Sequence, residues 1–415
     1  MSSRGQLQQA FGLTLIVLLL AGCGGTEGDP GARAVPPTGT TAPAADTAAP
    51  PTDTAAPPTN TPAPTGLDVS DLTSVFELTL CTMSDLAWSP DSDTLAISSL
   101  SALRILDTET EEVTSLGTPF DPEIDAQPSG DECLGIRFAN ALFSLDVVWL
   151  PNGETIAWAS PSTVGLWDVA SGEMTAEIEG ETVEVAGLNT SEPDMDTLVA
   201  MGEASAKSIQ SMDVSPDGSR LVFAQLQPEH SGQATIMQNG KLQVWALEPQ
   251  EALLHTLAEH EGSVYDVAWS PGGETIASAG KDKTVVLWDA GSGTVIDVLE
   301  GHEDEVTVVA WSPDGEKLAS IGRENAIRLW DVQTGDSITT LTGHTDWITS
   351  LAWSPDGRIL ASAGVPDDGT IRFWDTDTGE QMAVLNESAL VLAWSPDGST
   401  LAASNSSKLT LWSAP

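Results

Sequence analysis

The segment AWSPDG at residues 310–315 decides the fold, because close copies of it recur along the chain. With the copies at residues 268–273, 352–357 and 393–398, successive segments lie 42, 42 and 41 residues apart. In such a turn Pro presets φ, Asp hydrogen-bonds to nearby backbone, and Gly adopts a positive φ. Because strand-like runs lie on both sides of the turn, each copy predicts a small antiparallel unit.

Three more divergent copies, at residues 87–91, 148–153 and 213–218, bring the turns to seven. A Trp-Asp pair or a degenerate version of it also occurs seven times, starting at Leu106, Trp167, Trp245, Trp288, Trp330, Trp374 and Trp412. A period of about 40–45 residues with these marks resembles the WD40 repeat family. The resemblance extends over nearly all of residues 67–415 and is strongest over 255–415. It implies an all-β, seven-bladed WD40-type β-propeller with four antiparallel strands in each blade.

The two ends of the repeat region predict how the ring closes. The seventh repeat stops at Pro415 after its third strand, and Val75–Leu80 is a strand that belongs to no repeat. In the WD40 family the ring often closes by lending an N-terminal strand to the last blade. The resemblance therefore predicts that Val75–Leu80 pairs with Lys408–Trp412 and completes the last blade, which leaves no long exposed edge.

The N-terminus is typical of an export signal. Residues 1–22 contain an apolar run at 10–21, which is too short to span a bilayer but fits a secretory signal. The run ends in LAGC at 20–23, which resembles the lipobox of bacterial lipoproteins and implies a lipid on Cys23. We expect a protein that is lipid-anchored on the extracytoplasmic side of a bacterial membrane; an ordinary secretory signal is the alternative. Residues 23–66, rich in Pro, Thr and Ala, are expected to form a disordered tether.

The charge balance limits the classes of partner that the protein is expected to bind. The chain carries 61 acidic and 15 basic side chains, a formal net charge of −46. Of these, 57 acidic and 13 basic ones lie in residues 67–415, which therefore have a net charge of −44. Nucleic acid and docking on an anionic lipid surface through a basic patch are disfavoured, because both depend on Lys and Arg. The charge fits a solvated exterior, or a surface that attracts a basic protein partner or cations.

Histidine, serine, acidic residues and tryptophan recur together in the last repeats, and they could be mistaken for a catalytic triad. In the WD40 family such residues form a buried hydrogen-bond network that links a loop to the second and third strands. The resemblance implies three networks: His260, Ser278, Asp282 and Trp288; His302, Ser320 and Trp330, with Glu324 in place of Asp; and His344, Ser362, Asp368 and Trp374. Three copies favour a structural role, because an enzyme needs one site.

One position of the repeats is a candidate binding site. Trp347 aligns with Glu305 and Ser263, and the polar residues at the two aligned positions predict that this slot is exposed at the mouth of the central channel. An exposed Trp there would be a binding hot spot. The alternative is that Trp347 lies across its neighbouring blade.

The first three repeats contain insertions, and the resemblance to WD40 propellers implies that these emerge together on the top face. There they are expected to build a partner-binding surface; tolerated growth of the loops is the alternative. They lie at roughly 120–142, 180–207 and 228–240. Cys81 and Cys133 are candidates for a disulfide, because disulfides persist in exported proteins. The alternative is two separate buried thiols.

The sequence thus predicts a monomeric, non-catalytic protein-binding or scaffolding module that needs no cofactor or metal. No metalloprotease, paired-cysteine, phosphate-loop or serine-hydrolase motif is present in the sequence. Two alternatives remain, because a fold alone does not decide function. One is a hydrolase or lyase that uses acidic residues of the central channel, and the other is a cation-binding surface protein.

Overall fold

The structure is a computed structural model, and it describes most of the chain from Val69 onward. The described residues are 69, 72–80, 83–99, 102–117, 146–160, 163–179, 209–225, 228–231, 234–237, 240–247, 251–405 and 407–413. All of these residues belong to one compact unit, Ala63–Pro415. None of them forms a helix that is long and apolar enough to cross a bilayer.

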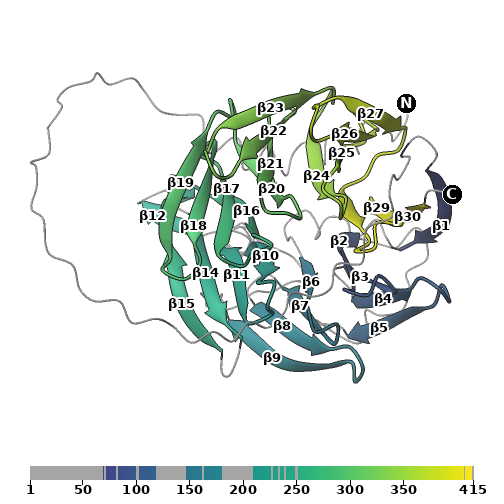
Figure 1. Cartoon of the computed structure of the whole chain (residues 1–415). Helices are drawn as coiled ribbons and strands as arrows, with labels where there is room; N and C mark the ends of the chain where they lie inside the picture. The colour runs from purple at the N-terminus through teal and green to yellow at the C-terminus, as the bar shows by residue number, and fades with distance from the viewer. Residues whose placement is uncertain are drawn as a thin grey trace, which may run out of the picture. The chain divides into compact units, whose positions relative to one another are not determined.

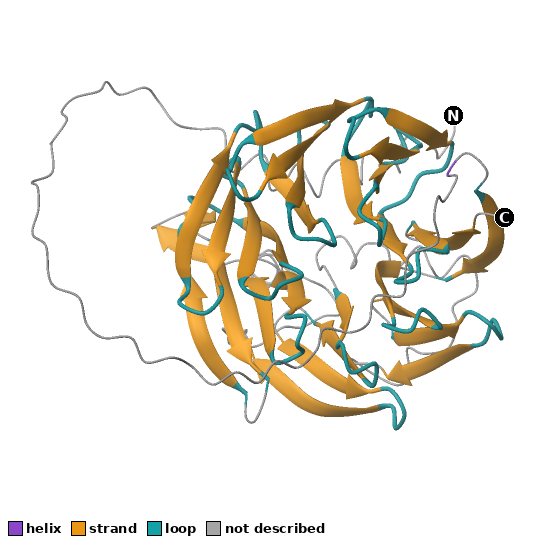
Figure 2. Ribbon diagram, viewed as in Figure 1, coloured by secondary structure: helices purple, strands orange, loops and turns teal. Residues whose placement is uncertain are grey.

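Seven four-stranded antiparallel sheets follow one another around a ring and form seven blades (Figures 1 and 2). Each blade runs from an inner strand near the centre to an outer strand at the rim. Contacts between neighbouring inner strands follow the order of the blades, and β2 of the first blade contacts β28 of the last. This confirms the predicted all-β, seven-bladed propeller with four strands in each blade.

The strands have the following bounds. The first blade comprises β2 (Met83–Trp88), β3 (Thr94–Ser99), β4 (Leu103–Asp107) and β5 (Val113–Gly117), and the second β6 (Val147–Trp149), β7 (Thr155–Ala159), β8 (Thr163–Asp168) and β9 (Glu173–Glu179). The third comprises β10 (Ile209–Val214), β11 (Arg220–Gln225), β14 (Lys241–Ala246) and β15 (Ala252–Leu257), with the hairpin β12 (Pro228–Ser231) and β13 (Ala234–Met237) between β11 and β14. The fourth comprises β16 (Val264–Trp269), β17 (Thr275–Gly280), β18 (Thr284–Asp289) and β19 (Thr294–Glu300), and the fifth β20 (Val306–Trp311), β21 (Lys317–Gly322), β22 (Ala326–Asp331) and β23 (Ser337–Thr342). The sixth comprises β24 (Ile348–Trp353), β25 (Ile359–Gly364), β26 (Ile371–Asp375) and β27 (Gln381–Leu385), and the seventh β28 (Val391–Trp394), β29 (Thr400–Ser404), β30 (Lys408–Ser413) and β1 (Thr73–Thr79).

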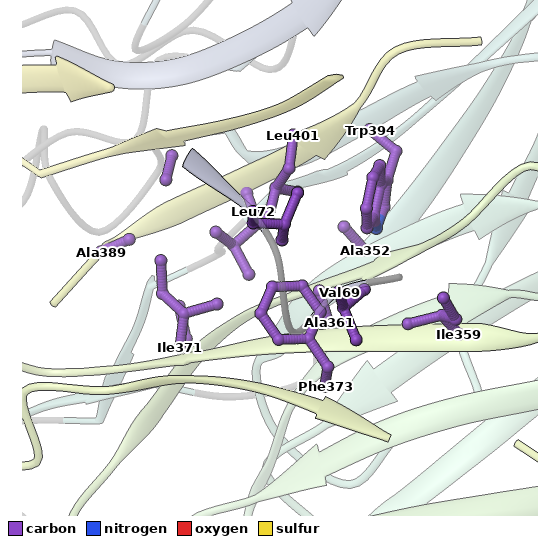
Figure 3. Close-up of a cluster of buried hydrophobic side chains, with 13 residues drawn as sticks. Val69, Leu72, Ala352, Ile359, Ala361, Ile371, Phe373, Ala389, Trp394 and Leu401 are labelled. Atoms are coloured by element: carbon purple, nitrogen blue, oxygen red, sulfur yellow. The ribbon is translucent and has the colours of Figure 1, made fainter. Parts of the chain in front are cut away.

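Burial changes from strand to strand within a blade. In the fourth blade, five of the six residues of β17 are buried, whereas five of the seven residues of the outer strand β19 are exposed. The core therefore lies between the blades near the ring's centre. Figure 3 shows one such cluster, in which Ile371 and Phe373 of the sixth blade pack with Trp394 and Leu401 of the seventh. Val69, which precedes β1, belongs to the same cluster.

The Pro-Asp-Gly turns join the first and second strands of the blades. In the fifth blade Gly315 has a φ of +73°, a conformation that only glycine adopts without strain. The first blade has no glycine there, and Ser92 takes the same conformation at +69°. In these turns a serine hydroxyl bonds the Asp carboxylate, as in the 2.6 Å bond from Ser312 to Asp314. The repeated motif thus carries its own local hydrogen bonds.

The ring closes by pairing the two ends of the described chain. β1 pairs antiparallel with β30, so that Phe76 lies opposite Leu411 and Leu78 opposite Leu409. The predicted closing strand is therefore confirmed, and it starts two residues earlier than the sequence indicated, at Thr73.

Candidate interaction surface

Two kinds of connection emerge on the same side of the ring. One kind leads from an outer strand to the next inner strand, and the other joins the second and third strands of a blade. Backbone N–H groups of the second kind donate to carbonyls of the first, over 2.9 Å each: Lys281 to Ser263, Arg323 to Glu305, and Val365 to Trp347. We call this side the top face, as defined by these connections.

The residues of the first His–Ser–Asp–Trp set lie together beneath the top face. His260 Nδ1 lies 3.0 Å from an oxygen of Asp282, and its Nε2 lies 2.7 Å from Ser278 Oγ. The indole N–H of Trp288 donates to the same Ser278 Oγ over 2.8 Å. Because a carboxylate only accepts, Nδ1 carries a proton, and in a neutral imidazole Nε2 then accepts from the serine hydroxyl. Each hydrogen-bond donor and acceptor named in this set therefore has a partner.

The second and third sets have the same geometry. His302 lies 2.6 Å from both Glu324 and Ser320, and His344 lies 2.9 Å from Asp368 and 2.7 Å from Ser362. Trp330 and Trp374 donate to the respective serines over 2.8 and 2.9 Å. The glutamate in the second set therefore reaches its histidine as an aspartate does.

Among the groups of these sets, the carboxyl of Asp282 and the imidazole of His344 show pKa shifts with clear causes. Burial alone would raise the pKa of Asp282, but bonds from His260 and Thr284 outweigh it and lower this pKa to about 2. Burial lowers the pKa of His344, against the opposing influence of Asp368. Ser278 and its two equivalents are fully buried, so a substrate has no access to their hydroxyls.

A second group of acidic residues lines the central channel. Three inner strands carry an aspartate three residues before their tryptophan, namely Asp85, Asp146 and Asp266, and each accepts a backbone N–H from the next blade over 2.9 Å. Ser211 and Ser350 take the same slot in other blades and bond the next blade over 3.3 and 3.0 Å. These bonds link inner strands that do not pair as sheets.

The channel holds a cavity of about 380 Å³, lined by all three of these aspartates and by Asp213. Asp213 accepts from the backbone N–H of Trp269 over 2.7 Å. These side chains touch the solvent of the channel but are enclosed by protein, and burial raises the pKa of Asp85 to about 6 and that of Asp213 to about 7. Among the residues described, no group of three or more His, Cys, Asp and Glu is arranged to hold a metal ion.

A third group lies on the top face around Trp347, whose exposed fraction is 39%. The guanidinium of Arg323 lies 5.6 Å from the centre of the Trp347 ring and 5.7 Å from that of Tyr265. Glu305 lies 3.3 Å from Arg323 Nε and accepts a 2.9 Å hydrogen bond from the Tyr265 hydroxyl. We call Tyr265, Glu305, Arg323 and Trp347 the arginine stack; it spans the fourth, fifth and sixth blades.

The expectation of exposure is wrong for Ser263. This residue is 6% exposed, whereas its aligned residue Trp347 is exposed. The segment before β14 explains the difference, because the backbone of Gly240 bonds Gly262 and passes close to Ser263 and Val264. The three aligned positions therefore have different surroundings, and only Glu305 and Trp347 belong to the arginine stack.

Several expected features lie outside the described residues. They are Cys23, Cys81, Cys133, the insertions at 120–142 and 180–207, and parts of the insertion at 228–240. Of the last insertion, the structure describes the hairpin of β12 and β13.

Sequence reasoning missed two groups. The channel aspartates have a detectable signal, since three of them stand at the same distance before a repeated tryptophan. Arg323 has none, because Lys281 and Val365 occupy its slot in the adjacent blades, and Tyr265 aligns with Thr307 and Thr349. Only the folded ring brings these single residues together.

Known proteins resemble parts of this chain. The family described as WD domain, G-beta repeat matches residues 251–289, 293–331 and 335–375. Each match runs from the outer strand of one blade through the first three strands of the next. The repeat in sequence is thus offset by one strand from the blade in space, as is the closing strand β1.

The curated relatives match short stretches. The chain is 31% identical to Protein hir1 of Aspergillus terreus over 101 residues, which are 22% of this chain and 9% of that protein. It is 33% identical to the mouse F-box-like/WD repeat-containing protein TBL1X over 89 residues, 21% of this chain and 14% of the relative. It is 51% identical to the probable cytosolic iron-sulfur protein assembly protein Ciao1 of Anopheles gambiae over 37 residues, 9% and 11% of the two chains. The chain thus spans less than a sixth of the length of these relatives.

The seven closed blades and these matches agree on one identification. The protein is a seven-bladed β-propeller, and three of its segments, at residues 251–289, 293–331 and 335–375, match the WD40 repeat.

Proposed function

We propose that the protein is a membrane-anchored scaffold that binds a partner protein through the top face of its propeller. The observation that carries this proposal is the exposed Trp347, which is held on that face by Arg323 and by a backbone bond to Val365. Interface hot spots are enriched in tryptophan, tyrosine and arginine, and all three residue types occur in the arginine stack. WD40 propellers typically act as scaffolds for protein interactions, which supports the same function.

A cross-linking experiment with matched variants tests the binding face. Glu261 and Glu303 are exposed on the top face, and Glu274 and Glu316 are exposed in the turns after the inner strands of the same two blades. The full chain is cross-linked in its native membrane, and the attached proteins are identified by mass spectrometry. We expect the double change Glu261→Lys with Glu303→Lys to abolish partners that Glu274→Lys with Glu316→Lys retains. Identical partners on both variants would contradict a top-face scaffold.

The anchoring part of the proposal rests on the segment at 20–23. A Cys23 that carries two or more acyl chains would hold the protein stably on the membrane, since one chain alone binds marginally. We expect Cys23→Ala to eliminate incorporation of a labelled fatty acid and to release the protein from membranes. Equal label on the variant and the wild type would refute the lipoprotein assignment.

The second candidate function is a hydrolase or lyase in the central channel. The observation that favours it is the pair of channel carboxyls, Asp85 and Asp213, whose raised pKa values suit general acid–base chemistry near neutral pH. The backbone bonds that both residues accept from the next blade give them a structural use as well. Screening the wild type and Asp213→Asn against ester, phosphoester and glycoside substrates tests this candidate. An enzyme of this kind must turn over one of these substrates, and Asp213→Asn must lose that activity.

A further inference from the structure

The arginine stack is held rigidly by contacts from three successive blades. Arg323 lies in the connection after β21, Tyr265 lies in β16, and Trp347 directly precedes β24. The backbone of Arg323 donates to Glu305, and its side chain reaches the same residue's carboxylate. Because blades four, five and six are each fixed by their own sheet, the Trp347 ring is preorganised, and binding to it costs little ordering entropy.

The charge around Trp347 selects the kind of partner. Arg323 already has a carboxylate partner in Glu305, so its charge is compensated within the stack. In the described structure no Lys or Arg forms an ion pair with the exposed carboxylates of the neighbouring top-face connections, although Lys283 donates to the backbone carbonyl of Glu303. These carboxylates belong to Glu261, Glu303, Asp304 and Asp367. Together with the net charge of the propeller, they attract cations and repel acidic segments.

We propose that Trp347 is the docking site for an arginine or lysine side chain of a basic segment of the partner protein. A cation stacks on an indole face within about 6 Å of the ring centre, and this contact strengthens as the pair is shielded from water. Arg323 shows that the Trp347 ring accepts a guanidinium, at 5.6 Å. The inference rests on the proposed scaffold function and specifies the chemistry of its partner.

A fluorine NMR titration tests the docking site directly. The full chain is labelled with 5-fluorotryptophan in detergent micelles, and the Trp347 signal is assigned as the one missing from Trp347→Phe. The probe is the peptide acetyl-Gly-Arg-Gly-Arg-Gly-amide at physiological salt. We expect it to shift the Trp347 signal, whereas acetyl-Gly-Glu-Gly-Glu-Gly-amide leaves that signal unchanged. A Trp347 signal that ignores the arginine peptide, or responds to both peptides alike, would overturn the proposal.

Calorimetric affinities separate stacking from diffuse attraction. We expect Trp347→Ala to weaken binding of the arginine peptide at least fivefold and Arg323→Ala to weaken it by a smaller factor, through loss of ring positioning. Glu274→Gln, which removes one exposed charge away from the top face, serves as the control and should change the affinity less than twofold. Equal affinities of Trp347→Ala and the wild type for the arginine peptide would show that the peptide binds through non-specific charge attraction, and would overturn the proposed stacking on Trp347.

The cross-linking of the glutamate variants separates a failure of the docking-site inference from a failure of the scaffold function. If partners depend on the top-face glutamates but Trp347 does not respond to the arginine peptide, only this inference fails. If both pairs of glutamate changes leave the same cross-linked partners, the scaffold function itself is refuted, whether or not the arginine peptide shifts the Trp347 signal.

Discussion

The indole N–H of Trp88, in the first blade, donates a 3.0 Å hydrogen bond to the carbonyl oxygen of Ala393, in the last. The same bond joins other neighbouring blades, from Trp149 to Ala87, from Trp311 to Ala268 and from Trp353 to Ala310. The ring is therefore closed at its centre as well as at its rim. Trp394 occupies the same slot, but its indole N–H has no partner in the described part of the chain.

Trp88 and Trp394 form a matched pair for measuring this inter-blade bond. Phenylalanine at either position leaves a cavity of similar size, but only Trp88→Phe also removes a hydrogen bond. We expect Trp88→Phe to lower the free energy of unfolding by about 1–2 kcal/mol more than Trp394→Phe. Urea denaturation of both variants measures the difference, and equal losses would show that the bond does not stabilise the closed ring.

Gly280 tests the His–Ser–Asp–Trp network without changing any of its members. A Cβ added there would overlap His260 Nδ1 and the Asp282 carboxylate, whereas a Cβ added at Gly272 meets nothing within 4 Å. We expect Gly280→Ala to cost roughly 1–3 kcal/mol, because it displaces His260 from its buried partners. Gly272→Ala is the control and should change stability by less than about 0.5 kcal/mol. A thermal unfolding series in which both variants behave alike would refute the importance of the network.

The sequence predicts features that repeat, and it fails where a contact is made once. The Pro-Asp-Gly turns, the three histidine sets and the closing strand follow from local chemistry or from a period, so they can be read along the chain. The exposure of Trp347 also follows from its polar aligned neighbours, although the same argument fails for Ser263, which Gly240 covers. Arg323 could not be found this way, because its partners Tyr265 and Trp347 come from other blades and have no equivalents in the repeats.

Deleting β1 should prevent closure at the rim. Without residues 72–80, β30 keeps β29 but loses its outer partner β1, and the unpaired edge of β30 recruits other chains. We expect this variant to aggregate and to lose cooperative unfolding, whereas deletion of residues 40–60 in the proposed tether should change neither property. Size-exclusion chromatography and calorimetry of the two deletions provide the comparison. A monomeric, cooperatively folded protein after the first deletion would contradict the role of β1.

Stability should rise on mild acidification. Burial raises the pKa of Asp213 to about 7, above its ordinary value of 3.8, so the folded state binds the proton more tightly than the unfolded chain. The resulting stabilisation is complete below pH 3.8 and is lost as the pH rises through 7. Asp282 has the opposite sign, because its pKa is lowered to about 2, and its contribution is lost below pH 3.8. We expect a maximum near pH 4–5.

Asparagine at position 213 isolates this effect. Asp213→Asn keeps an acceptor for the Trp269 N–H, loses the acceptor for the Val214 N–H and cannot ionise. It should be more stable than the wild type at pH 8, by on the order of 2–4 kcal/mol, and this difference should shrink as the pH falls and vanish below about pH 4. Glu274→Gln controls for the change in net charge and should keep the pH dependence of the wild type. Parallel curves for the wild type and Asp213→Asn would exclude Asp213 as the titrating group.

The pairing of Cys81 with Cys133 stays a prediction from the sequence. A bond between them would close a loop of about 50 residues and stabilise the fold by roughly 4 kcal/mol, in the chain-entropy account. We expect no free thiol at these two positions when the protein is denatured without reductant. Thiol titration of the Cys23→Ala chain measures this, and two reactive thiols would refute the bond.

The pairing of Thr73 with Ser413 also fixes when the protein can finish folding. These residues are 340 positions apart, so β1 is synthesised long before its partner strand β30. At about 5–20 residues per second, β1 waits on the order of 20–70 s for its partner during synthesis. Throughout that time the nascent chain holds an unpaired strand at its N-terminal end and up to six finished blades without a closed ring. A cell that makes this protein must therefore protect an open ring until β30 has been synthesised.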